Sequence, residues 1–174
     1  MESPTIPPES PPESPRLRIR RAERRDAPRL MEMAAALARS HGDAATPSRR
    51  SIERDLFGPS ACGLALVAER GGRLIGYALL SCVPHPQWGE RLMNLNHLYV
   101  EEGLRGRGIG RHLVAEAVAE ARRQECGRII VGTHAENLRA QALYQSLGFL
   151  PRPDGGPRFG LDLPADGALP AGWV

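Results

Sequence analysis

The residues with the clearest chemical potential are three glycines interleaved with arginines. The run Arg105-Gly106-Arg107-Gly108-Ile109-Gly110 follows the apolar stretch Leu98-Tyr99-Val100 and opens an amphipathic helix. The first turn of a helix leaves backbone N–H groups unpaired, and with the helix dipole it forms an anion site. Glycine lets phosphate oxygens approach the backbone, while Arg105, Arg107 and Arg111 add charge and donors. The spacing therefore predicts a site for a phosphate-bearing ligand.

Two familiar phosphate loops do not fit this run. A nucleotide triphosphate loop needs G-x-x-x-x-G-K-[ST], and the chain has no lysine, since all 23 basic residues are arginine. A dinucleotide loop needs G-x-G-x-x-G near the first strand, whereas these glycines are spaced differently and lie in the second half of the chain. Taken alone, the run also fits an ordinary tight turn at a helix start.

A second block downstream favours the phosphate interpretation. Asn137-Leu138-Arg139-Ala140-Gln141-Ala142-Leu143-Tyr144 is followed by Leu147-Gly148-Phe149. Together with Arg105-x-x-Gly108-x-Gly110, this order resembles the two motifs of the GCN5-related N-acetyltransferase (GNAT) family. The resemblance is sharp over residues 92–150, and over residues 16–91 only the order of elements fits.

The residue patterns predict a single α/β domain over residues 16–163, between a Pro/Ser/Glu-rich tail (1–15) and a C-terminal tail (164–174). Alternation at 16–20 indicates a strand, Asp26 a helix N-cap, and Ser48 or Ser51 the start of a second helix reaching Phe57. Apolar runs joined through Gly71-Gly72 predict a hairpin, and a further strand spans about 91–100. The expected order is β-α-α-β-β-β-α-β-α-β-β, with a mixed sheet flanked by helices, as in the resembled family.

Later elements follow from periodicity. A helix over 108–126 is expected to bury Ile109, Leu113, Ala117, Val118 and Ala121, and to leave His112, Glu116, Glu120 and Arg123 in water. Residues 128–131 are predicted to form a short strand, and residues 137–147 are predicted to form a helix that ends at Gly148. Phe149-Leu150 and Arg158–Leu163 are predicted to form a last strand pair.

The resemblance implies that acetyl-CoA is the cosubstrate. In this family the strand before the glycine turn carries a bulge and diverges from the next strand, so that pantetheine lies between them. By this likeness the Leu98 N–H polarises the thioester carbonyl, and Asn137, also a plain helix N-cap, bonds the pantetheine arm. The cofactor-binding residues are then Leu98, Tyr99, Val100, Arg105, Gly106, Arg107, Gly108, Ile109, Gly110, Arg111 and Asn137.

The resemblance also implies the catalytic residues. Tyr144 matches the family tyrosine that protonates the departing thiolate, although a helix tyrosine packed in the core is the alternative. Members that use a general base often place Glu or His at the positions of Asn94 and Asn96, and these two amides cannot accept a proton but can position water or substrate. His97 suits the task by its pKa, but alternation directs it to the opposite face unless the bulge falls there. His134, Glu101 and base-free transfer through ordered water stay open.

The implied activity is acetyl transfer from acetyl-CoA to a primary amine by direct attack in a ternary complex. A non-catalytic acyl-CoA-binding sensor of the same fold is the alternative, which Asn94 and Asn96 favour and Tyr144 opposes. The acceptor itself is not readable from the sequence, and homodimers are common in the resembled family.

Composition and short motifs favour a small anionic ligand and argue against nucleic acid, a membrane or a metal as a partner. The tail carries three glutamates and no arginine, so the formal charge of +3 becomes +6 for residues 16–174, which suits a polyanionic small ligand. Aromatics are only 5% and no nucleic-acid module is recognisable, so nucleic acid is not expected. No apolar run is long enough to cross a membrane. His134-Ala135-Glu136 has no P-C-x-x-C after it, so no metal is expected.

The cysteines indicate the compartment. Cys62, Cys82 and Cys126 form no C-x-x-C pair, and their odd number argues against a disulfide framework. The reducing cytoplasm is therefore the expected location.

Overall fold

The computed structural model describes residues 16–44 and 46–152. These residues fall into two compact units, the first ending at Asn137 and the second beginning at Leu138. The expected tails and the expected strand at 158–163 lie outside the described residues. The elements are β1 Leu17–Arg21, a 3-10 turn Arg24–Asp26, α1 Ala27–His41, α2 Arg49–Phe57, β2 Leu64–Arg70, β3 Arg73–His85, a 3-10 turn Pro86–Trp88, β4 Glu90–Val100, a 3-10 turn Glu102–Leu104, α3 Ile109–Arg123, β5 Arg128–Val131 and α4 Leu138–Ser146.

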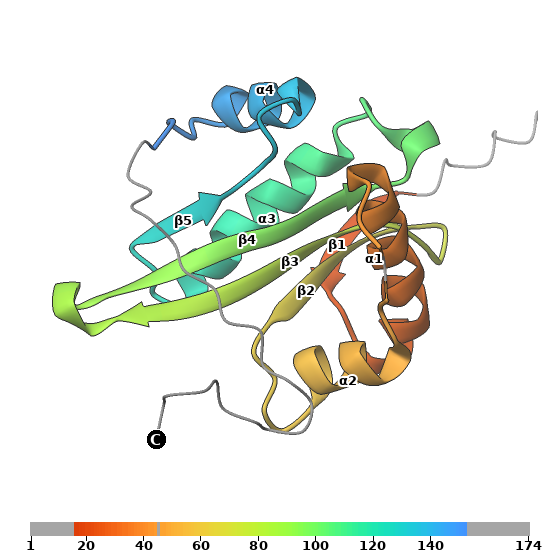
Figure 1. Ribbon diagram of the computed structural model, residues 1–174, viewed down its shortest axis with the longest axis horizontal. Helices are drawn as coiled ribbons and strands as arrows, with labels where there is room; N and C mark the ends of the chain where they lie inside the picture. Colours follow the sequence, from red (N-terminus) through yellow and green to blue (C-terminus); the bar gives the residue numbers. More distant parts are fainter. Residues whose placement is uncertain (1–15, 45, 153–174) are drawn as a thin grey trace, which may run out of the picture. The chain divides into compact units, whose positions relative to one another are not determined.

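The first unit is built on one mixed five-stranded sheet with strand order β1-β2-β3-β4-β5 (Figure 1). The first four strands pair antiparallel, and β5 pairs parallel to β4. The parallel pair requires a crossover, which α3 supplies between β4 and β5. This confirms the predicted fold class and the predicted order of elements as far as α4.

The hairpin of β2 and β3 turns at the two glycines that predicted it. Gly71 and Gly72 have φ of 58° and 75°, the left-handed conformation that a two-residue hairpin turn needs at both central positions. Side chains with a Cβ rarely adopt this conformation, so the Gly-Gly pair fixes the register of the hairpin.

Helices cover both faces of the sheet. Leu30 and Met33 of α1 pack with Val67 and Tyr77 in one apolar cluster. On the opposite face α3 lies against β3 at Gly76, where an added Cβ would lie 3.5 Å from Leu113 Cδ1 and 2.7 Å from the Tyr99 carbonyl oxygen. A side chain at position 76 would therefore push β4 or α3 away.

The helix starts were predicted at the right residues but not always for the right reason. Ser48 caps α2, because its hydroxyl oxygen accepts a hydrogen bond from the Ser51 N–H (3.0 Å). Asp26 precedes α1, yet its carboxylate accepts from the Glu23 N–H (2.8 Å) and from the Arg20 guanidinium (2.6 Å) rather than from the helix.

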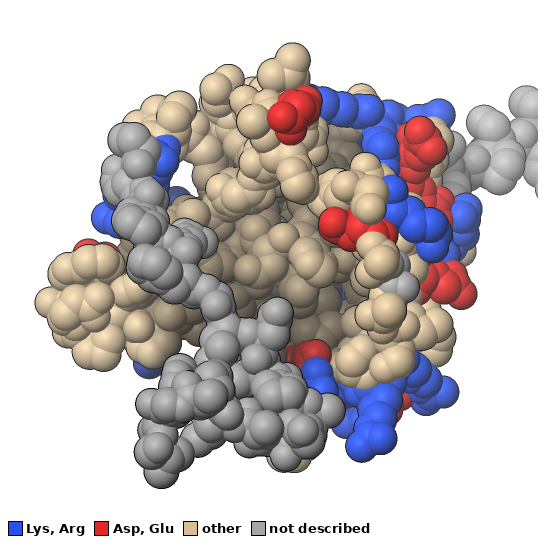
Figure 2. Space-filling view, in the orientation of Figure 1, with Lys and Arg blue, Asp and Glu red and all other residues tan. Residues whose placement is uncertain are grey.

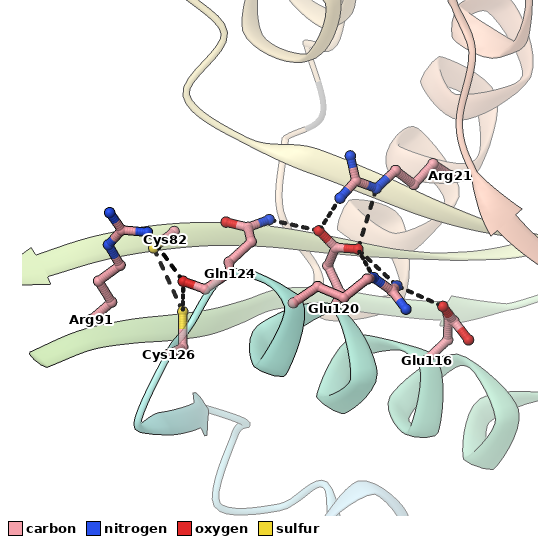
Figure 3. Close-up of polar contacts among 8 residues, drawn as sticks. Arg21, Cys82, Arg91, Glu116, Glu120, Gln124 and Cys126 are labelled. Atoms are coloured by element: carbon pink, nitrogen blue, oxygen red, sulfur yellow. Dashed lines mark hydrogen bonds and ion pairs between the residues drawn. The ribbon is translucent and has the colours of Figure 1, made fainter.

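One prediction about α3 is wrong. Glu120 was expected in water, but its side chain is fully buried beneath Arg21 of β1 (Figure 3). Arg123 Nη2 (2.8 Å) and Gln124 Nε2 (2.7 Å) also donate to this carboxylate. Burial alone would raise the pKa of Glu120, but these hydrogen bonds and the one from Arg21 lower it, so the buried group stays charged.

The expected strand at Phe149-Leu150 is also wrong. Both residues follow α4 without regular structure, and the Phe149 N–H donates back to the Tyr144 carbonyl (3.0 Å). Gly148, with φ of 86°, ends α4 as predicted.

Candidate active site

The glycine turn leads directly into the first turn of α3. Gly106 and Gly108 have φ of 82° and 80°, so both adopt a conformation that favours glycine. The Gly108 carbonyl accepts the His112 N–H (3.1 Å), and the N–H groups of Ile109 and Gly110 lie ahead of this first bond, where helix geometry gives them no acceptor inside the helix. These amides lie at the positive end of the helix dipole, which is the arrangement that binds phosphate.

Gly110 is glycine for a different reason. It lies in the first turn of α3 and its φ is not positive, so the backbone itself does not require glycine there. Alanine would stabilise such a helical position by roughly 0.5–1 kcal/mol. A glycine at this position leaves the first-turn amides open to the close approach of a ligand.

Three exposed arginines surround this turn. Arg105 Nε donates to the Val100 carbonyl (3.0 Å), which ties the turn to the end of β4. Among the described residues, no carboxylate forms an ion pair with Arg105 or Arg107. Arg111, the third residue of α3, is exposed in the first turn of the helix. The positive charge of Arg105 and Arg107 is thus left for a ligand.

The strand before the turn has the predicted bulge and divergence. Leu79 pairs with His97 but Leu80 pairs with Leu95, so Asn96 is the extra residue of β4. The pairing of β4 with β5 ends at Leu95 and Val131. Beyond this point β4 continues for five residues without β5 beside it.

The backbone of β4 after the bulge points in a defined direction. The Glu101 N–H donates to the Ile75 carbonyl of β3 (3.0 Å). Successive residues of a strand turn their N–H and C=O to alternate sides, so Tyr99 faces β3 while Leu98 and Val100 face the edge that β5 has left. This places Leu98 and Val100 where an extended ligand could pair with them, as the resemblance implies.

The bulge also decides which face His97 occupies. Ser81 pairs with Asn94 and Leu79 pairs with His97, so these four residues share one face of the sheet. Asn96 joins them, since its Nδ2 donates to Ser81 Oγ (2.8 Å). His97 therefore lies on the same face as Asn94 and Asn96, which is the outcome that simple alternation did not predict.

The surroundings of His97 keep it neutral. Its Nδ1 lies 2.9 Å from the hydroxyl of buried Tyr77, and the two rings meet edge to face. Burial lowers the pKa of His97, and the nearby His41 lowers it further. His41 in turn packs its ring against His134 at 5.0 Å. A neutral imidazole at pH 7 can accept a proton.

Glu101 is not available as a base in this arrangement. Its carboxylate is paired with Arg29 and with Arg73 (2.7 Å), and its side chain is largely buried. Both of its oxygens accept hydrogen bonds from guanidinium groups, so its role here is to join α1 to the ends of β3 and β4.

The surface on this side of the sheet is uneven in charge. Figure 2 shows charged side chains gathered over α1 and α2, while the middle of the view, over β3 and β4, is hollowed and tan. The polar groups named above on β3 and β4 are uncharged amide, hydroxyl and imidazole groups.

The remaining predicted residues are Asn137, at the end of the first unit, and Tyr144, in the second unit. Asn137, the last residue before this unit, directly precedes α4, and its N–H donates to the His134 carbonyl (3.0 Å). Tyr144 is buried, with its ring 5.7 Å from that of Phe149. Burial raises the pKa of Tyr144 to about 12. The phenol therefore keeps its proton throughout the physiological pH range.

Three residues near His97 were not found from the sequence. Tyr77, Ser81 and His41 belong to segments that carry no motif, and their positions follow only from the register of β3 and from the end of α1. The alternating pattern of β3 would have identified Tyr77 and Ser81 as sharing a face, but not which face.

Comparison with known proteins agrees with this geometry. A family model described as the acetyltransferase (GNAT) family matches residues 27–149, most of the chain. The chain belongs to the GNAT family. It is similar to N-acetyltransferase 8B from Homo sapiens, with 36% identity over 91 residues, 52% of this chain and 40% of that relative. The matched stretch thus spans well under two thirds of the relative's own length.

Solved GNAT structures share the fold. A crystal structure of a probable acetyltransferase superposes with a TM-score of 0.74 and 25% identity, covering 84% of this chain and 98% of that one. The aminoglycoside N-acetyltransferase AAC(6')-Iy, solved in complex with CoA, superposes with a TM-score of 0.70 and 19% identity, covering 88% and 99%. Within the described part of this GNAT chain, no helix is long and apolar enough to cross a membrane.

Proposed function

We propose that this protein transfers the acetyl group of acetyl-CoA to a primary amine. The observation that carries the proposal is the glycine turn at the start of α3, next to a strand edge that β5 has left. The turn offers amides and arginines to the diphosphate, and the edge offers Leu98 and Val100 to the pantetheine arm. Family membership supports acetyl-CoA as the donor. We further propose that the enzyme works in the cytoplasm.

The proposed reaction is direct attack in a ternary complex. The neutral amine nitrogen attacks the thioester carbonyl carbon, the carbonyl oxygen becomes an oxyanion, and collapse of the intermediate expels the CoA thiolate. The Leu98 N–H, directed away from β3, is the proposed donor to the oxyanion. One such donor typically lowers the barrier by about 3 kcal/mol.

His97 is the side chain best placed to take the proton of the amine. The bulge brings it to the face of Asn94 and Asn96, and its lowered pKa keeps it neutral at pH 7. Tyr77 engages Nδ1, which leaves Nε2 as the nitrogen that can face a substrate. Asn96, bonded to Ser81, is proposed to position the substrate or a water molecule. Transfer through ordered water is the alternative if His97 proves dispensable.

Tyr144 is the proposed acid for the leaving thiolate. A phenol with a pKa of about 12 is fully protonated at pH 7 and can donate to a thiolate whose conjugate acid has a pKa of about 8.5 only while the two are in contact. Its place in the Asn137–Phe149 block supports this role, as does the proposed contact of Asn137 with the pantetheine arm.

The proposal is tested by incubating the full-length protein with acetyl-CoA and a panel of amines. The panel contains a diamine, an aminoglycoside, an amino acid and a peptide with a free N-terminus, and released CoA is followed by chromatography. We expect one class to release CoA, and Tyr144→Phe to lower turnover at least tenfold while leaving the Kd for acetyl-CoA within about twofold.

Two results would speak against this account. Binding of acetyl-CoA without release of CoA by any amine favours the sensor of the same fold. Unchanged turnover in Tyr144→Phe removes the acid role from this residue while leaving the transferase activity in place.

A further inference from the structure

Two cysteines that lie far apart in the sequence meet in the structure. Cys82 of β3 and Cys126, which follows α3, are 44 positions apart, yet their sulfur atoms lie 3.6 Å from each other (Figure 3). Cys82 is exposed and Cys126 is partly buried, and both are free thiols. The third cysteine, Cys62, lies between α2 and β2, where its N–H donates to the Asp55 carbonyl.

The backbone after α3 fixes the position of Cys126. The Cys126 N–H donates to the Ala121 carbonyl (2.9 Å) and the Glu125 N–H to the Arg122 carbonyl (3.0 Å), which is the Schellman pattern at a helix end. Glu125 takes the left-handed position with φ of 56°, at a cost of roughly 1–2 kcal/mol for a residue with a Cβ.

A second anchor ties this segment to the sheet. The Gly127 N–H donates to the Arg91 carbonyl of β4 (3.0 Å), and Arg91 Nη1 donates to the Gln124 carbonyl (3.2 Å). Cys126 is thus held between two bonded residues, Glu125 and Gly127. The approach of the two thiols follows from the fold and does not depend on a flexible loop.

We propose that Cys82 and Cys126 form a thiol–disulfide modification site whose reactant is a low-molecular-weight disulfide such as oxidised glutathione. The Cys82 thiolate attacks one sulfur of the reactant, forms a mixed disulfide and expels one thiolate, which takes up a proton. The Cys126 thiolate then attacks the Cys82 sulfur and expels the second thiolate. Two protein thiols are oxidised to one disulfide, and one small disulfide is reduced to two thiols.

The exposure of the two thiols sets the order of these steps. Cys82 is accessible to the reactant, whereas Cys126 is in contact with Cys82 and partly covered. The charged or titratable groups that act on Cys126 are its neighbour Cys82 from β3 and, through their charge, Arg91 from β4 and Glu120 from α3. Burial, with the neighbouring thiol and Glu120, raises the pKa of Cys126 to about 11 against the favourable charge of Arg91. The second step should therefore speed up as the pH rises above neutral, because more of Cys126 is then thiolate.

The proposed Cys82–Cys126 disulfide would cross β4 and stabilise the edge of the sheet at β5. Cys82 pairs with Met93, and Met93 pairs with Ile129 of β5, so the three residues lie at one level across the sheet. A bond from Cys82 to Cys126 joins β3 to the segment that leads into β5. Closing this loop is expected to raise the midpoint of thermal unfolding by roughly 5–10 °C.

The experiment treats full-length Cys62→Ser protein with oxidised glutathione at pH 7 and pH 9, traps free thiols by alkylation, and measures intact mass. We expect a fully oxidised product that has lost two hydrogens and carries no glutathione, with a peptide map linking residues 82 and 126. Conversion of the mixed disulfide into the Cys82–Cys126 disulfide should become about tenfold faster for each unit by which the pH is raised. The matched Cys126→Ser variant, with Cys62→Ser, should stop with one glutathione on Cys82.

Two outcomes overturn the proposal. One is stable glutathione on both Cys82 and Cys126 in the same molecule. The other is two free thiols that persist in glutathione buffers poised as oxidising as the endoplasmic reticulum. Because the readouts are mass and linkage, the test is independent of whether the protein acetylates an amine.

Discussion

Arginines lie at the C-terminal end of helix α3 and in the turn before its N-terminus, and their surroundings at the two ends differ. At the C-terminal end, Arg123 pairs with Glu116 (2.7 Å) and with buried Glu120, which Arg21 of β1 also contacts (Figure 3). At the N-terminal end, Arg105 and Arg107 have no carboxylate partner among the described residues, and glycines replace side chains.

The dipole of the helix makes this contrast informative. Cations near a helix C-terminus are stabilised, whereas cations near the N-terminus are destabilised by roughly 0.3–1 kcal/mol each. The C-terminal arginines therefore contribute to folding, and the N-terminal arginines oppose it. The simplest reason for arginines at the N-terminal end is that they bind an anionic ligand, which supplies the negative charge that the chain does not place there.

The largest expected effect is at Gly110. Gly110→Val should raise the Kd for CoA about a hundredfold, or ~2.7 kcal/mol, because the side chain blocks approach to the first-turn amides. The thermal midpoint should change by less than about 2 °C, since the residue is already helical. Calorimetric titration and thermal unfolding measure the two quantities.

Gly103→Ala provides the control for Gly110→Val. Position 103 lies in the 3-10 turn before the glycines, and nothing lies within 4 Å of a Cβ added there. Equal losses of CoA affinity in both variants would contradict a site confined to the start of α3.

A substitution near the C-terminal end of α3 should change the stability of the protein and leave CoA binding unchanged. Glu120→Ala should lower the free energy of unfolding by about 2–3 kcal/mol, because it removes a buried carboxylate that three donors share. The Kd for CoA should stay within twofold. Urea unfolding gives the first value, and a large loss of affinity at unchanged stability would reverse the roles assigned to the two ends.

The same carboxylate predicts a dependence of stability on pH. The folded pKa of Glu120 is lowered, so its contribution is complete above its unfolded pKa, near 4.3, and is lost as the pH falls through the folded value. The difference in unfolding free energy between wild type and Glu120→Gln should be constant from pH 8 to 6. It should shrink below pH 4, and a difference that grows on acidification would contradict the assignment.

The smallest expected effect separates two exposed arginines. Arg107→Ala should raise the Kd for CoA about three- to fivefold and weaken its dependence on salt, since one cation facing the diphosphate is removed. Arg123→Ala should leave that Kd unchanged and reduce stability instead. Titrations at two salt concentrations distinguish them, and identical behaviour of the two variants would remove the contrast between the ends.

Much of the fold was predictable because local patterns and tertiary packing agree. The Gly71-Gly72 turn, the Ser48 cap and the strand at 128–131 were expected within a residue or two, since each depends on neighbours in sequence. The glycine turn was predictable for the same reason. Its glycine spacing, helix start and arginines all lie within seven residues.

The features that were missed depend on long-range contacts. Glu120 lies three residues after Ala117 and seven after Leu113, so its position is on the buried face of α3. Glutamate was nevertheless predicted to be exposed, because it is a charged residue type. Its partner Arg21 is 99 positions away. The Cys82–Cys126 contact and the location of the β4 bulge likewise require the register between strands, which no local spacing reports.

The most direct test of the central claim is a titration of the isotope-labelled protein followed by amide NMR. CoA should shift the amide resonances of Arg107, Gly108, Ile109, Gly110 and Arg111 strongly, because their N–H groups are proposed to cradle the diphosphate. Pantetheine, which lacks the diphosphate, should leave these five amides in place while shifting Leu98 and Val100. Unchanged resonances at the start of α3 with saturating CoA, or equal shifts with pantetheine, would contradict the account.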